Sequence, residues 1–141
     1  MVKALVFAAA GVLLVAAAAG GTTVAAKWTA TLKPGAGSKI SGTASLEPAG
    51  DNQAKAEIKI TGGTPNAEYP WHVHTGSCAK TGGVAGSPTN YPVMKVGKDG
   101  TGSASASMPF AAPDSGSYYV NVHKSSSEMG VSVACGDLHK S

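Results

Sequence analysis

Arginine is absent from this chain of 141 residues, whose eleven basic residues are all lysines. Without a guanidinium group, no side chain can clamp a carboxylate or phosphate with two parallel hydrogen bonds. Charged residues make up 13% and hydrophobic residues 43%, a balance that excludes a disordered polyelectrolyte and a coiled coil. The formal charge of +3, or +2 without Lys3, comes with no basic cluster, which argues against nucleic-acid binding. The length suits one domain.

Long hydrophobic runs are rare, and the one that exists opens the chain. An apolar run over residues 4–19 follows the positively charged Lys3. Small residues up to Ala26 then occupy the positions that a signal peptidase recognises. This pattern predicts a secretory signal peptide over residues 1–26 and a mature domain over residues 27–141 that does not span a membrane. The alternative is an uncleaved membrane anchor, but the run is shorter than the ~20 residues of a spanning helix.

Cysteine is scarce, because Cys78 and Cys135 are the only two. Export to a secreted or periplasmic location places both in an oxidising compartment, where two cysteines pair rather than persist as thiols. We therefore expect a disulfide between them, with Cα atoms within about 7 Å of each other. Such a bond would contribute much to a small domain with few large side chains.

Helical periodicity is missing beyond the signal peptide, and alternation with a period of two takes its place. The clearest segment is 54–60, where Ala and Ile alternate with Lys and Glu. Turns rich in Gly, Pro, Asn and Asp separate such segments, and residues 75–90 are expected to form a loop. Eight short strands with regular turns predict an all-β sandwich or flattened barrel. The expected strands span residues 28–32, 40–46, 54–60, 69–73, 91–96, 102–108, 118–122 and 131–135.

The histidines, all after residue 70, are the candidate chemistry. His72 and His74 lie at i and i+2 on a predicted strand, so they share the face opposite the core residues Trp71 and Val73. His123, near the end of another strand, also points away from the core. Three imidazoles without a neighbouring cysteine or carboxylate suit copper, zinc or nickel, and copper(II) stands highest in the affinity series. On spacing alone, solvated strand histidines remain the alternative, because such pairs are common.

The fourth histidine, His139, follows the last predicted strand in a short polar tail. We interpret it as a solvated surface residue, with a role as a fourth metal ligand as the alternative. Lys80 and Lys124 lie near the candidate ligands in the sequence and would add positive potential for an anion. The sequence has no nucleophile elbow, paired carboxylates or phosphate-binding glycine loop, so it predicts no hydrolytic enzyme.

Several segments together resemble the exported copper/zinc superoxide dismutases. Residues 71–78 (WHVHTGSC) resemble that family's copper-ligand strand and the disulfide cysteine after it. Residues 119–124 (YVNVHK) resemble its late strand, which ends in another copper histidine, and residues 133–137 (VACGD) resemble its closing strand. Residues 32–42 and 96–102 resemble two of its hairpins. The order matches over the whole mature chain, and the resemblance implies an eight-stranded Greek-key β-sandwich.

By this resemblance, His72, His74 and His123 hold one copper ion per chain, and Cys78–Cys135 corresponds to the family's disulfide. The copper site is expected to be partly open to solvent, because the covering loops are short. A dismutase of this type converts superoxide to oxygen and hydrogen peroxide. The alternatives are a non-catalytic copper-binding or storage protein and a metal-free sandwich resembling the chordin-type domain.

The sequence departs from the family at the zinc ligands and at the residue that holds the superoxide anion. The family has a long loop that carries zinc ligands and a histidine bridging the two metals, whereas residues 79–90 here contain no His, Asp or Glu. We therefore expect copper without zinc. The family's superoxide-holding arginine, three residues before the last cysteine, is replaced by Ser132. The chain thus resembles a copper-only version without the zinc loop, whose dismutase activity the sequence leaves open.

Overall fold

The computed structural model describes residues 14–20 and 26–141. Residues 14–20 form neither helix nor strand and are exposed, and the predicted signal peptide lies largely outside the described residues. The helical content of the described part is one 3₁₀ turn, Pro88–Asn90. No helix in this part of the chain is long and apolar enough to cross a membrane.

The described domain is built almost entirely of antiparallel strands. They are β1 (Trp28–Pro34), β2 (Ser41–Pro48), β3 (Ala54–Thr61), β4 (Glu68–Tyr69), β5 (Trp71–Gly76), β6 (Thr81–Val84), β7 (Met94–Lys95), β8 (Gly102–Met108), β9 (Tyr118–His123) and β10 (Ser132–Lys140). Eight of them form one sheet in the order β6-β5-β9-β10-β1-β2-β3-β8, while β4 pairs with β7. Strands β3 and β8, like β5 and β9, are neighbours in the sheet without being consecutive, as in a Greek key.

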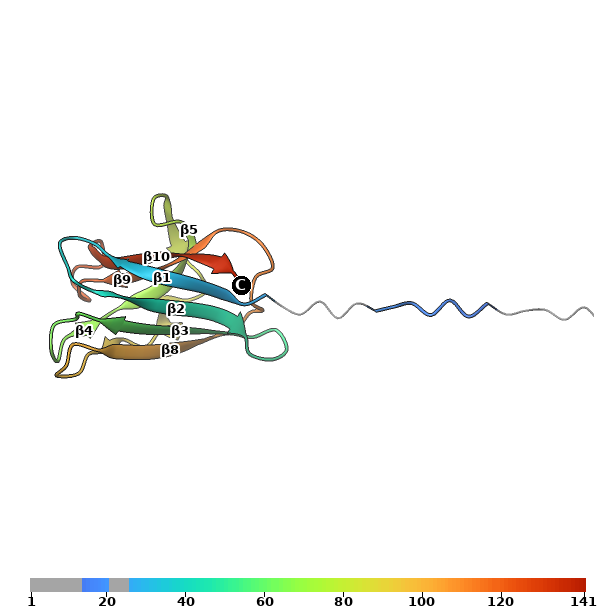
Figure 1. Cartoon of the computed structure of the whole chain (residues 1–141), viewed down its shortest axis with the longest axis horizontal. Helices are drawn as coiled ribbons and strands as arrows, with labels where there is room; N and C mark the ends of the chain where they lie inside the picture. Colours follow the sequence, from blue (N-terminus) through green and yellow to red (C-terminus); the bar gives the residue numbers. More distant parts are fainter. Residues whose placement is uncertain (1–13, 21–25) are drawn as a thin grey trace, which may run out of the picture.

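The sheet curls on itself, so that the half containing β1, β2, β3 and β8 encloses a core with the half containing β5, β9 and β10 (Figure 1). The buried apolar side chains of both halves form one continuous cluster. Its largest fully buried member from the second half is Trp71, and Ile58 and Ile60 contribute from the first. This arrangement confirms the predicted all-β sandwich.

Three expected element boundaries were wrong. The predicted loop over residues 75–90 contains β6, which pairs with β5 in antiparallel orientation. A Cβ at Gly82 would lie 2.2 Å from the carbonyl oxygen of Thr75, so the pairing depends on glycine there. The strand expected over residues 91–96 shrinks to β7, and the last strand continues beyond residue 135 to Lys140.

The disulfide is confirmed. Cys78, in the turn after β5, is bonded to Cys135 on β10, with a Cα–Cα distance of 6.0 Å. The Cys78 amide also donates a hydrogen bond of 2.7 Å to the Asp137 carboxylate on the same strand. Closing a loop of 57 residues stabilises the fold by about 4 kcal/mol on the chain-entropy argument. The bond indicates folding in an oxidising environment.

Candidate metal centre

The three predicted ligand histidines come together in one cluster, called the histidine cluster below. Strand β5 pairs with β9 in antiparallel register, with His72 opposite Asn121. This register brings His72 Nδ1 to 3.0 Å from His123 Nε2. One nitrogen from each of His72, His74 and His123 lies within 4.8 Å of the other two. Two nitrogens that each lie about 2.0 Å from one ion are at most ~4 Å apart. The observed separations are close to that limit, and the group could hold one metal ion.

The histidine cluster is more buried than the sequence predicted. The exposed fractions of His72, His74 and His123 are 6%, 8% and 5%. Residues 71–74 of β5 and 119–123 of β9 are buried without interruption, so both faces of these strands are covered. The site was expected to be partly open to solvent, whereas the three imidazoles are almost entirely buried. Backbone carbonyl groups from β6 and from the loop after β9 lie against the His74 and His123 rings.

Backbone carbonyl groups fix the orientation of two imidazole rings. His74 Nδ1 lies 3.1 Å from the Gly82 carbonyl oxygen, and His123 Nδ1 lies 2.6 Å from the Met129 carbonyl oxygen. A carbonyl oxygen only accepts, so each Nδ1 donates a proton and each Nε2 keeps a lone pair. Metal-bound histidines are held in the same way by hydrogen bonds to the non-ligating nitrogen.

One nitrogen of the cluster lacks a partner. His74 Nε2 is buried and makes no hydrogen bond with any described residue. A buried polar atom without a partner costs about 1–3 kcal/mol, and a metal ion bound by this lone pair would remove that cost. The residues present therefore fit a metal ion.

The three imidazoles of the histidine cluster have lowered pKa values, which favour their uncharged form. Burial lowers the pKa of His72 to about 4, assisted by the neighbouring His123 and His74. Burial also lowers the pKa of His74 and of His123, opposed in each ring by the hydrogen bond to a backbone carbonyl. The three imidazoles are therefore neutral at pH 7, which is the form that binds a metal.

Two tyrosines frame the cluster, and the sequence analysis did not identify either as part of the site. The Tyr119 ring stacks on His74, with centroids 4.9 Å apart and planes inclined by 18°. Tyr91 meets His72 edge-on at 5.1 Å and donates a 2.7 Å hydrogen bond to the Ala85 carbonyl. Burial raises the pKa of Tyr91 to about 12, so it remains a neutral donor. Alternation with His123 on β9 was the available signal for Tyr119, whereas Tyr91 lies in an irregular segment.

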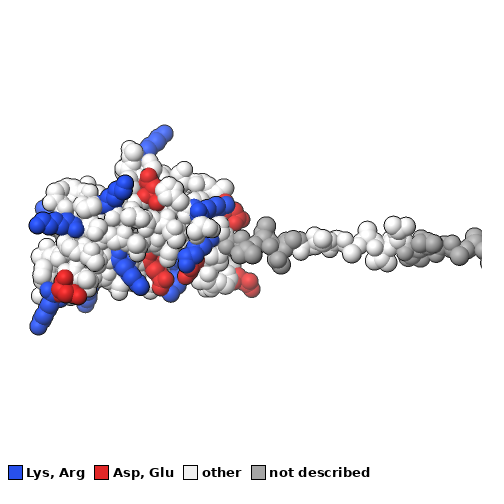
Figure 2. Space-filling model, viewed as in Figure 1, with Lys and Arg blue, Asp and Glu red and all other residues white. Residues whose placement is uncertain are grey.

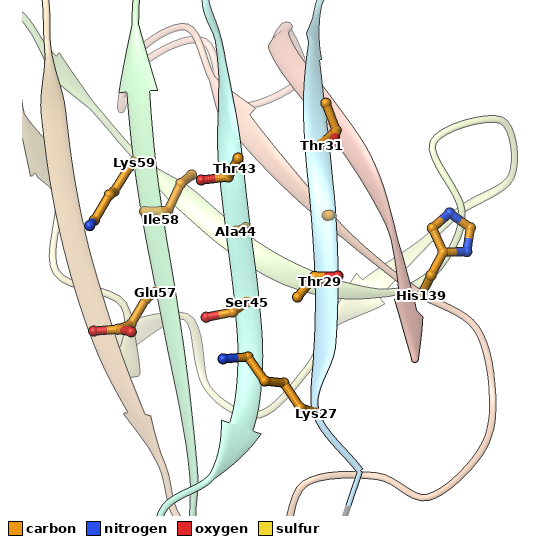
Figure 3. Close-up of a pocket in the computed structure, with 11 residues that line it drawn as sticks. Lys27, Thr29, Thr31, Thr43, Ala44, Ser45, Glu57, Ile58, Lys59 and His139 are labelled. Carbon is orange, nitrogen blue, oxygen red and sulfur yellow. The ribbon is translucent and has the colours of Figure 1, made fainter. Parts of the chain in front are cut away.

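His139 is exposed, as predicted, but it lies on β10 rather than in a tail after the last strand. It borders a depression on the outer face of β1, β2 and β3 (Figure 3). The residues lining this depression are Lys27, Thr29, Ala30, Thr31, Thr43, Ala44, Ser45, Glu57, Ile58, Lys59 and His139. None of the three clustered histidines is among them, and His139 does not belong to the metal-binding group.

The lysines considered for anion attraction are exposed. Lys80 lies in the turn between β5 and β6, and Lys124 directly follows His123. The Lys124 ammonium pairs with Glu128 at 2.9 Å, which offsets much of its positive potential. Lysines and acidic residues are also interspersed over the face of the molecule seen in Figure 2. The histidine cluster therefore has no fixed cation comparable to an arginine beside it.

Comparisons with known proteins extend this description at the level of the fold. No protein-family model matches the sequence, and no curated protein does. Among solved structures, the chain is similar to the crystal structure of the clock protein EA4, with 20% identity and a TM-score of 0.56. The match covers 84% of this chain and 96% of the other. At this identity the likeness shows the fold alone. Fold and site together define a β-sandwich protein with a buried cluster of three histidines.

Proposed function

We propose that this chain is an exported copper-binding protein, related to the copper/zinc superoxide dismutases, that holds one copper ion at His72, His74 and His123. The observation that carries the proposal is the unpartnered lone pair of buried His74 Nε2, within 4.8 Å of ligand nitrogens from the other two rings. Imidazole sites without carboxylates or thiolates favour copper(II) in the affinity series. The disulfide and the predicted signal peptide support a secreted or periplasmic location.

The three histidines would bind the ion, and their burial would keep most water away from it. The carbonyl groups of Gly82 and Met129 orient His74 and His123, while the Tyr119 ring limits rotation of His74 by stacking. Bound copper would supply one-electron redox chemistry to a small substrate reaching the centre. The low exposure of the three histidines favours a substrate of few atoms.

Dismutation of superoxide is the second candidate, supported by the resemblance to the copper/zinc superoxide dismutases. Ser132 stands where the family has its arginine, and Lys124 is paired with Glu128, so we expect slow capture of the anion. Non-catalytic copper storage is therefore the competing function for the same site. The metal-free chordin-like alternative requires that His74 Nε2 stay without a partner.

The test is metal analysis of the exported, purified protein, followed by superoxide decay measured per bound copper. One copper per chain supports the proposal, and turnover above that of a His123→Ala protein distinguishes the enzyme from a storage protein. Absence of copper after loading, or stoichiometric zinc in its place, would contradict the proposal. The prediction that no second, zinc-binding site is present is checked in the same analysis.

A further inference from the structure

A buried carboxamide lies beside the histidine cluster and has no role in holding the metal. Asn121 shares a face of β9 with His123, since the two residues are separated by two positions, and it lies directly opposite His72 on β5. Its exposed fraction is 9%, comparable to the histidines themselves. A polar side chain so placed costs free energy unless its hydrogen-bonding groups are used.

Only one end of the Asn121 carboxamide is engaged by the protein. Its oxygen Oδ1 accepts a hydrogen bond from the Ser132 hydroxyl on β10. Its amide nitrogen Nδ2 makes no hydrogen bond with the described residues. Strands β5 and β10 lie on opposite sides of β9. Because Ser132 on β10 binds the oxygen, the amide group is left for another partner, and β5 with His72 lies on the other side of β9.

The position of Ser132 depends on an irregularity in β10. The register between β9 and β10 shifts between Ser132 and Ala134, so Ser132 lies opposite His123 while Val133 remains buried in the core. The bulge thus brings a hydroxyl group to the histidine face without removing Val133 from the core. Ser132 therefore lies at the bulge and within hydrogen-bonding distance of Asn121.

We propose that Asn121, oriented by Ser132, donates a hydrogen bond to a small anion at the open coordination position of the bound metal. The inference rests on the proposed function, because it requires copper at the histidine cluster. The ligand class is a monoanion of two or three atoms, such as superoxide or its inert substitute azide. The three histidines and Asn121 are only 5–9% exposed, which favours a small anion over a large one. Asn121 is a specificity-determining residue that substitutes a neutral donor for a cation.

The experiment is an azide titration of the copper-loaded protein, followed by the charge-transfer absorption and the copper electron paramagnetic resonance spectrum. Asn121→Leu keeps the approximate shape of the side chain and removes the donor, so azide affinity should fall about tenfold or more. Ser132→Ala frees the carboxamide to rotate and should weaken azide about threefold, whereas Ser132→Thr retains the hydroxyl and should restore it. Copper affinity, measured by chelator competition, should remain within about twofold in all three variants.

The possible results separate this inference from the proposed function. Stoichiometric copper with equal azide affinity in wild type and Asn121→Leu overturns the inference and leaves copper binding intact. A wild-type chain that takes up no copper overturns both. If Asn121→Leu fails to fold, the Ser132→Ala and Ser132→Thr pair decides, because equal azide affinities in these two proteins contradict an orienting hydroxyl.

Discussion

Strand β3 and strands β5 and β9 lie in the same sheet but bury their side chains differently. In β3 the buried and less buried positions alternate, with Ala54, Ala56, Ile58 and Ile60 in the core. In β5 and β9, residues 71–74 and 119–123 are buried without alternation. The second face of these strands is covered although it carries histidines, an asparagine and a tyrosine. Burial of polar groups is costly without partners, so this face is where a metal ion would have the largest effect.

The largest expected effect comes from removing the disulfide that links the turn after β5 to β10. The double variant Cys78→Ala and Cys135→Ala should lower the free energy of unfolding by about 4 kcal/mol, because it restores the conformational freedom of a 57-residue loop. Urea denaturation at pH 7 measures it. Glu57→Ala on β3, which breaks the exposed Lys55–Glu57 pair, serves as the control and should change the free energy of unfolding far less. Similar losses of unfolding free energy in the disulfide variant and in Glu57→Ala would show that the disulfide gives the histidine-bearing half no special stabilisation.

Acid should destabilise the metal-free protein through the same buried face. The pKa of His72 falls from 6.5 to about 4 on folding, so between these values the unfolded chain binds a proton that the folded chain does not. Stability from this residue is therefore lost as the pH falls from about 6.5 to 4, by about 3 kcal/mol in total. Urea denaturation at a series of pH values should show a smaller decline in His72→Asn. Parallel declines in both proteins would refute this assignment.

Removal of one ligand should abolish tight copper binding without disturbing the other half of the sheet. We expect His123→Ala to weaken copper affinity at least about 100-fold, equivalent to about 2.7 kcal/mol. Competition with a chromophoric chelator provides the measurement. His139→Ala is the matched control, since His139 is exposed on β10 and outside the cluster. Equal losses for the two variants would show that copper binds at the surface.

The smallest effect should come from the outer face of β3. Lys59 is exposed beside the depression of Figure 3 and makes no ion pair among the described residues. Lys59→Ala should change the free energy of unfolding by no more than about 0.5 kcal/mol and leave copper affinity unchanged. The same two measurements, denaturation and chelator competition, apply. A loss near that of the disulfide variant would mean that this face is covered by a partner.

Segments with one exposed face were predicted almost to the residue. The expected strands over 54–60 and 102–108 correspond to β3 (Ala54–Thr61) and β8 (Gly102–Met108). Their alternation of apolar and polar residues directly encodes burial on one side. Strand β6 was missed because Gly82 and Gly83 carry no side-chain pattern and contribute only backbone groups to the contacts with β5.

The sequence by itself determined that His72 and His74 share a face, because side chains alternate along any strand, and that two cysteines were available to pair. Only the tertiary structure decided that β5 lies beside β9 with His72 opposite Asn121. That register brings His123 into reach and places Tyr119 on His74. It also decided the burial of all three imidazoles; the Gly82 carbonyl of β6 covers His74, and the Met129 carbonyl covers His123. The contact between His72 and His123 joins residues 51 positions apart, and local alternation carries no information about which distant strand becomes a neighbour.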